Sequence, residues 1–145
     1  MNGFAAQTYR RVDLDSRVAA ADPHQLVLLL FDGALEALHL AASHLAAGRI
    51  AQKGQALAKA VRIVEEGLKA SLDYNAGGAL AQQLASLYDY CVFRLLQANL
   101  RNDAKAVAEV TALLSDLREA WAAIGARQRS AAPQERAASA LALTA

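Results

Sequence analysis

Apolar residues recur at spacings of three and four along most of this chain, and short clusters of turn residues interrupt the pattern. That period places the apolar residues on one side of an α-helix, whereas strands would show strict alternation. The pattern predicts helices over residues 23–47, 50–74 and 79–100, and a fourth from a cap at Asn102 to about Ile124. We find no competing strand signal.

The predicted helix ends carry residues that suit them. Asp22 can cap the first helix, Pro23 occupies a position that needs no N–H, and Gln25 completes a capping box. Gly48 suits the left-handed conformation that follows a helix, and Gly125 is expected to close the fourth helix in the same way. Residues 75–78, Asn-Ala-Gly-Gly, are predicted to separate the second helix from the third.

Four long helices joined by short links must run antiparallel to their neighbours. We therefore predict an all-α fold, an up-down-up-down antiparallel four-helix bundle over residues 22–125. Residues 1–21 form an N-terminal cap segment, which carries too many apolar residues for a solvated arm and too few positions for a fifth helix. The Ala/Arg/Ser-rich residues 126–145 form a mostly flexible tail.

The helices carry more apolar surface than one buried face requires. On a helical wheel the first helix leaves an apolar arc of roughly 240°, and on the third helix Tyr90 and Phe93 lie among glutamines and serines. A bundle helix touches two neighbours, so the wide arcs could simply be core. Alternatively, they form a groove for an amphipathic helix of a partner.

Composition narrows the function classes. The chain has 145 residues, enough for one domain, and its formal net charge of +1 offers no basic surface for nucleic acid. A single cysteine, Cys91, fits a reducing compartment and excludes an internal disulfide. The start of the chain lacks the layout of a secretory signal, and the longest apolar run, residues 26–31, is too short to cross a bilayer. We expect a cytoplasmic protein without membrane insertion.

No catalytic constellation can be assembled. Glu36 and His39 have the spacing of a di-iron helix, but the second copy and the additional carboxylates that such a site needs are missing. His44 is the least implausible reactive group, and a histidine phosphotransfer bundle is therefore the alternative function. His44 lacks a basic residue close by in sequence that would stabilise a phosphoryl group. We expect no catalytic residue, metal, cofactor or small-molecule substrate.

Short motifs in order along the chain resemble the flagellar secretion chaperone FliS family. They are YRRV at 9–12, PHQL at 23–26, LFDGA at 30–34, KGQALAKA at 53–60, GLKA at 67–70, GG at 77–78, LYDY at 87–90, LLQAN at 95–99 and AW at 120–121. Each is weak alone, whereas the ordered set, from about residue 9 to 124, is specific.

This resemblance implies a helical bundle without enzyme activity or cofactor. It implies a chaperone that binds the C-terminal segment of flagellin, prevents its polymerisation in the cytoplasm and escorts it to the flagellar type III export gate. We predict that the apolar arcs supply the contact surface. The predicted partner-contacting residues are Tyr9, Leu14, Val18, Leu28, Phe31, Leu35, Leu38, Ile63, Tyr88, Val92 and Leu96. We also predict that the N-terminal segment covers part of this surface until flagellin displaces it, which frees Tyr9 for the gate.

Overall fold

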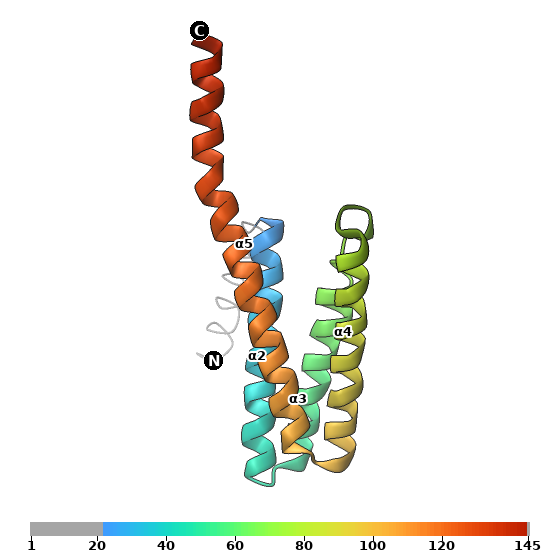
Figure 1. The fold of residues 1–145 in the computed structure, drawn as a ribbon. Helices are drawn as coiled ribbons and strands as arrows, with labels where there is room; N and C mark the ends of the chain where they lie inside the picture. Colours follow the sequence, from blue (N-terminus) through green and yellow to red (C-terminus); the bar gives the residue numbers. More distant parts are fainter. Residues whose placement is uncertain (1–21, 145) are drawn as a thin grey trace, which may run out of the picture.

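A computed structural model describes the backbone of residues 22–144 and the side chains of residues 22–127. The chain forms α2 (Pro23–Ala46), α3 (Ile50–Arg62), the π-helical segment η1 (Ile63–Lys69), α4 (Tyr74–Arg101) and α5 (Ala104–Thr144). Because η1 continues α3 without a break, the described chain forms four rods and contains no strand (Figure 1). The all-α prediction is confirmed.

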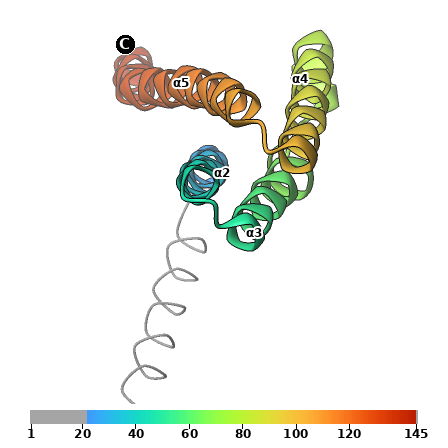
Figure 2. The same cartoon turned by 90° about the horizontal axis from the view of Figure 1, so that it is seen from below.

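The four rods pack as an antiparallel bundle. α2 contacts α3 and η1 on one side and α5 on the other, while α4 also contacts η1, α3 and α5. Figure 2, looking along the bundle, shows α2 between α3 and the long α5, with α4 on the far side of α3. Consecutive rods reverse direction at short turns, as the sequence predicts.

The first helix begins and ends as predicted. Asp22 is extended, and its carboxylate accepts a hydrogen bond from the Gln25 N–H at 2.8 Å, with Pro23 in the first helical position. At the other end Gly48 has a φ of +75°, a left-handed conformation that costs a glycine little. This turn reverses the chain between α2 and α3.

The connection between the second and third rods lies earlier than predicted. The second rod ends at Lys69 rather than Tyr74, and Asp73 caps α4 by accepting from the N–H groups of Asn75 and Ala76. The predicted interruption survives as a distortion inside α4, because Gly78 has φ +51° and ψ −126°. The predicted interruption at residues 75–78 therefore exists, but α4 already begins before it, at Tyr74.

The turn between the third and fourth rods also needs a correction. Asn102 does not cap the fourth helix; it ends α4 in the left-handed conformation, with φ +51°. The next residue provides the cap, since the Asp103 carboxylate accepts from the N–H groups of Lys105 and Ala106. The backbone of Asn102 therefore ends one helix, and the side chain of Asp103 begins the next.

Gly125 does not close the fourth helix, because α5 continues to Thr144. Gly125 is buried against the ring of His24, so close packing accounts for the glycine. The alanine-rich sequence that follows has high helix propensity, which permits the continuation. The flexibility expected of residues 126–145 stays a prediction.

Small and branched apolar side chains fill the core. Its buried members include Ala34, Leu57, Val64, Leu95 and Leu114, from all four rods. Cys91 is also fully buried, and burial raises the pKa of its thiol to about 11. The thiol is therefore protonated at neutral pH and packs as a small hydrophobic group.

One charged side chain lies inside this core. Lys53 on α3 is only 2% exposed, and its Nζ donates to the Asn99 carbonyl at 2.9 Å and to Asn102 Oδ1 at 2.5 Å. The first acceptor is a carbonyl in the last turn of α4, where a cation is favoured by the helix dipole. Lys53 thus fixes the α4–α5 turn against α3.

We predict that Lys53→Met destabilises the protein by about 2–3 kcal/mol, since it leaves buried acceptors without a donor. Urea unfolding followed by circular dichroism measures the change. Lys59→Met, on the exposed side of the same helix, is the matched control and should change stability by less than about 0.5 kcal/mol. Equal effects of the two substitutions would contradict the anchoring role of Lys53.

Candidate partner-binding site

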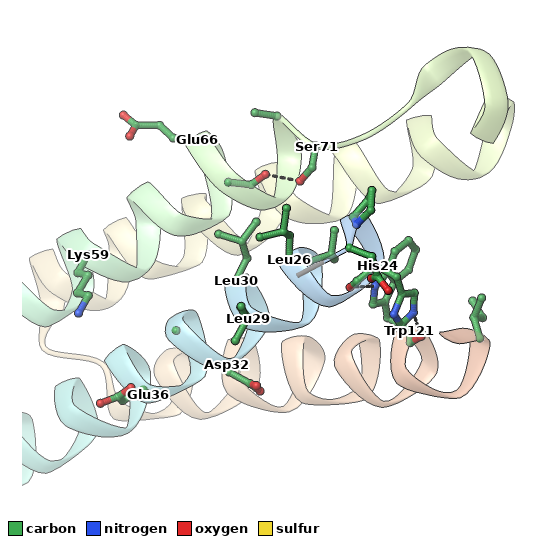
Figure 3. A pocket seen from close by; sticks show the side chains of 17 residues that line it. His24, Leu26, Leu29, Leu30, Asp32, Glu36, Lys59, Glu66, Ser71 and Trp121 are labelled. Carbon is green, nitrogen blue, oxygen red and sulfur yellow. Dashed lines mark hydrogen bonds between the residues drawn. The ribbon is translucent and has the colours of Figure 1, made fainter. Parts of the chain in front are cut away.

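A long groove runs over the outward side of α2. It has a volume of about 1210 Å³ and is lined by residues of α2, of α3 and η1, and of α5. Figure 3 shows α2 between the two flanking helical walls, with Leu26 and Leu30 near η1 and Trp121 on α5. We define the α2 groove by these lining residues: Asp22, Pro23, His24, Leu26, Val27, Leu29, Leu30, Asp32, Gly33, Glu36, Lys59, Glu66, Gly67, Ala70, Ser71, Trp121 and Ile124.

The α2 groove combines an apolar floor with charged edges. Leu26 and the adjacent pair Leu29 and Leu30 lie one turn apart on α2, and Ile124 extends the apolar surface onto α5. The charged groups are those of Asp22, Asp32, Glu36, Lys59 and Glu66. An apolar strip with charged margins is the surface that an amphipathic helix requires.

Glycine brings the η1 wall close to the floor. A Cβ at Gly67 would lie 2.8 Å from Cδ2 of Leu30, nearer than real side chains approach. Opposite, Gly33 of α2 faces Ile63, whose Cδ1 would be 3.4 Å from an added Cβ. The π-helical hydrogen bonding of η1 accompanies this close packing, and π-helical turns are frequent at functional sites.

His24 and Trp121 fasten the other wall at the N-terminal end of α2. His24 Nε2 lies 2.6 Å from the Trp121 carbonyl, which can only accept, so Nε2 carries the proton. Trp121 Nε1 donates back to the His24 carbonyl at 3.0 Å, and the two rings stack with centroids 4.8 Å apart. We call this reciprocal contact the His24–Trp121 clasp.

The clasp depends on Gly125, one turn beyond Trp121. A Cβ on Gly125 would fall within 2.6 Å of three atoms of the His24 ring. Farther along α2, the Arg118 Nε donates to Asp32 at 2.5 Å and joins the same two helices. This ion pair is half exposed and adds little stability, but it sets the charge at the groove edge.

Four of the predicted contact residues prove to be core. Phe31, Leu38, Tyr88 and Val92 are all buried, so their expected position on the outer surface is wrong. α2 has neighbours on two sides and α4 packs against α3, η1 and α5, so these arcs are covered within the chain. Burial also raises the pKa of Tyr88 to about 12.

The remaining predicted residues are divided. Leu28, Leu35 and Ile63 are half-buried, and Leu96 on α4 is exposed. Tyr9, Leu14 and Val18 lie outside the described residues. Among the predicted contact residues that the structure describes, none lines the α2 groove. Their roles in partner contact stay predictions.

The residues that line the groove were not among the contact residues predicted from the sequence. Leu26, Leu30 and Trp121 all stand in motifs that carry the family resemblance, but neither those motifs nor the apolar arcs indicate that the three residues share a surface. A signal was available in the small residues of the second predicted helix, which include Gly67 and Ala70. Small residues mark the place where two helices approach closely.

The histidines do not assemble a catalytic site. Over residues 22–127, no group of three His, Cys, Asp or Glu side chains could hold a metal ion. His39 is exposed, and His44 Nδ1 accepts a hydrogen bond from Arg49 Nε at 2.8 Å. The structure thus supplies the basic neighbour that the sequence around His44 lacked, but the guanidinium occupies one ring nitrogen.

By length and composition alone, α2 is long and apolar enough to cross a membrane. In the structure this helix packs against α3, η1 and α5 as a member of the bundle. The fold and the groove together define a helical-bundle binding module.

Comparison with known proteins gives the family. The family described as "Flagellar protein FliS" matches residues 5–128. The flagellar secretion chaperone FliS of Salmonella typhimurium is 52% identical over 115 residues, covering 79% of this chain and 85% of the relative. FliS of Escherichia coli K12 is 46% identical over the same shares, and FliSB of Pseudomonas aeruginosa is 38% identical, covering 81% and 92%.

The chain belongs to the FliS family of flagellar secretion chaperones. Its members are chaperones rather than enzymes, which agrees with the absence of enzyme activity expected from the sequence. A chaperone of flagellar export implies a protein partner. The phosphotransfer alternative receives no support from the family.

We predict that Gly125→Ala opens the clasp and destabilises the protein by about 1–3 kcal/mol, because the new methyl group collides with the His24 ring. Thermal unfolding measures the loss, and fluorescence of Trp121, the single tryptophan of the chain, should change in the folded state. Gly54→Ala is the control: its Cβ would be 3.7 Å from Asn99 Oδ1, an ordinary contact. This second substitution should be neutral or stabilising, as alanine favours the helix. The clasp is disproved if both variants behave alike.

Proposed function

We propose that the protein binds the C-terminal segment of flagellin in the α2 groove, keeps it from polymerising in the cytoplasm and delivers it to the flagellar export gate. The observation that carries this proposal is an open apolar groove between α2, η1 and α5 on a chain of the FliS family. An amphipathic helix laid along α2 would bury the apolar floor and leave its polar side in water.

The chemistry of the groove suits a partner that folds as it binds. Leu26, Leu29 and Leu30 offer apolar contacts at helical spacing, and the ring of Trp121 offers a flat surface at one end. A disordered segment loses conformational entropy when it forms a helix there, which limits the affinity. Limited affinity serves a chaperone that must release its cargo for export.

The N-terminal segment is joined to α2 at one end of the groove. Residues 1–21 join α2 at Asp22, and Asp22 lines the groove. A segment tethered there is at high local concentration beside the apolar floor. We propose that it covers part of the groove in the idle chaperone, and that flagellin displaces it and frees Tyr9 for the gate.

A groove substitution with a matched control tests the binding site. Leu29→Glu places a carboxylate on the floor and should weaken binding of a flagellin C-terminal peptide at least 10-fold, about 1.4 kcal/mol. Leu100→Glu makes the same change at an exposed position of α4 outside the groove. It should leave the affinity for the flagellin peptide unaltered. Isothermal titration calorimetry gives both constants, with flagellin lacking its C-terminal segment as the negative control. Equal affinity in both variants would place the site elsewhere.

Removing residues 1–18 tests the proposed competition. The shortened chain should bind the flagellin peptide more tightly, since fewer molecules have the groove covered. Its docking to the export gate should be impaired because Tyr9 is missing. In the intact chain, amide protection of the segment should fall when flagellin is added. A rise in protection, or unchanged affinity after truncation, would instead indicate that the segment clamps bound flagellin.

A further inference from the structure

One carboxylate interrupts the apolar stripe on the floor of the α2 groove. The groove is lined along α2, at helical spacing, by Leu26, Leu29, Gly33 and Glu36, and Leu40 follows one turn later. Spacings of three and four place these five residues on one face of the helix. Leu29 is 38% exposed and Leu40 49%, and Glu36 is exposed between them. Glu36 therefore stands among apolar side chains on the open face of α2.

The charge of Glu36 is not balanced by any ion pair among residues 22–127. Arg118, the basic residue that α5 brings to this side of α2, pairs with Asp32 one turn earlier. Lys59 lies on the α3 wall of the groove and forms no ion pair with Glu36 (Figure 3). The carboxylate is thus available to a cation from outside the described part of the chain.

A helix that packs along this stripe must come close to the carboxylate. Gly33 has no side chain, so the backbone of a partner can approach α2 within one turn of Glu36. A helix that contacts both Leu29 and Leu40 covers Glu36, which lies between them. Removing a carboxylate from water without a cation is strongly unfavourable, whereas a Lys or Arg gives it a charge-assisted hydrogen bond. An entirely apolar partner face is therefore disfavoured at this point.

We propose that Glu36 selects a cargo helix that carries a Lys or Arg on the side facing the groove. This inference rests on the proposed function, since it takes the C-terminal segment of flagellin as the occupant of the α2 groove. Glu36 follows Leu29 by about two turns. The cation of the cargo therefore lies about two turns from the apolar residue that contacts Leu29. Glu36 discriminates among amphipathic helices that the apolar floor alone would bind equally well.

Glu36→Leu gives the most direct test, because it makes the stripe apolar up to Leu40. A groove that only buries apolar surface would then bind the flagellin C-terminal peptide more tightly. We expect the opposite, a loss of affinity of about 10-fold or more in isothermal titration calorimetry, because the cation of the peptide loses its partner. Glu65→Leu, at an exposed position of η1 outside the groove, is the matched control and should leave the affinity unchanged. Unchanged or tighter binding by Glu36→Leu overturns the proposal.

Charge exchange identifies the cation of the cargo. Each Lys and Arg of the peptide is replaced by Glu in turn, and every peptide is titrated against the wild-type chain and against Glu36→Arg. One altered peptide should bind the wild type about 10-fold more weakly and regain most of its affinity for Glu36→Arg. If Lys59 neutralises Glu36 in the complex instead, no peptide is rescued and Lys59→Met weakens binding, which overturns the proposal.

Leu29→Glu separates failure of this inference from failure of the proposed function. If Leu29→Glu weakens peptide binding and Glu36→Leu does not, the groove binds flagellin without selecting a cation, and only the role of Glu36 is overturned. If Leu29→Glu leaves the affinity unaltered, the peptide binds elsewhere and both proposals fail. Circular dichroism melting checks that each variant of the full chain is folded before it is titrated.

Discussion

The close approach of α2 to a helix on either side is the constraint on which the rest of the structure depends. Gly67 lets η1 reach Leu30 on one side, and Gly125 lets α5 receive the ring of His24 on the other. Larger residues at either position would push a wall outward and expose the core between the helices. With both walls in place, the outward side of α2 becomes the floor of a groove.

The architecture was accessible from the sequence because local signals agreed. Helical periodicity located the four rods, Asp22 with Pro23 marked the first start, and Gly48 marked the first turn. One boundary failed because two neighbouring residues could serve the same purpose. Asn102 and Asp103 are both acceptable caps, and only the backbone conformation shows which of them ends α4 and which begins α5.

The site was harder to predict, because a helical wheel shows which residues are apolar and not which of them a neighbour covers. Phe31 and Tyr88 fell on outer arcs and are buried, while Leu29 fell on an arc that stays open. The burial of Lys53 could not be predicted either, because its hydrogen-bond partners are far away along the chain. Its acceptors at Asn99 and Asn102 lie 46 and 49 residues away, and no local pattern announces them.

The His24–Trp121 clasp joins residues 97 positions apart. It belongs with the Arg118–Asp32 pair to the contact between the first and fourth rods, α2 and α5, whereas the other main rod-to-rod contacts connect consecutive rods. The entropy lost on closing a loop grows with its length, so the turns between consecutive rods can form before α5 reaches α2. The groove is therefore completed by a late step in folding. On partial unfolding, separation of α5 from α2 is the change that leaves the most local turns intact, and the groove would be lost while three of the rods remain assembled.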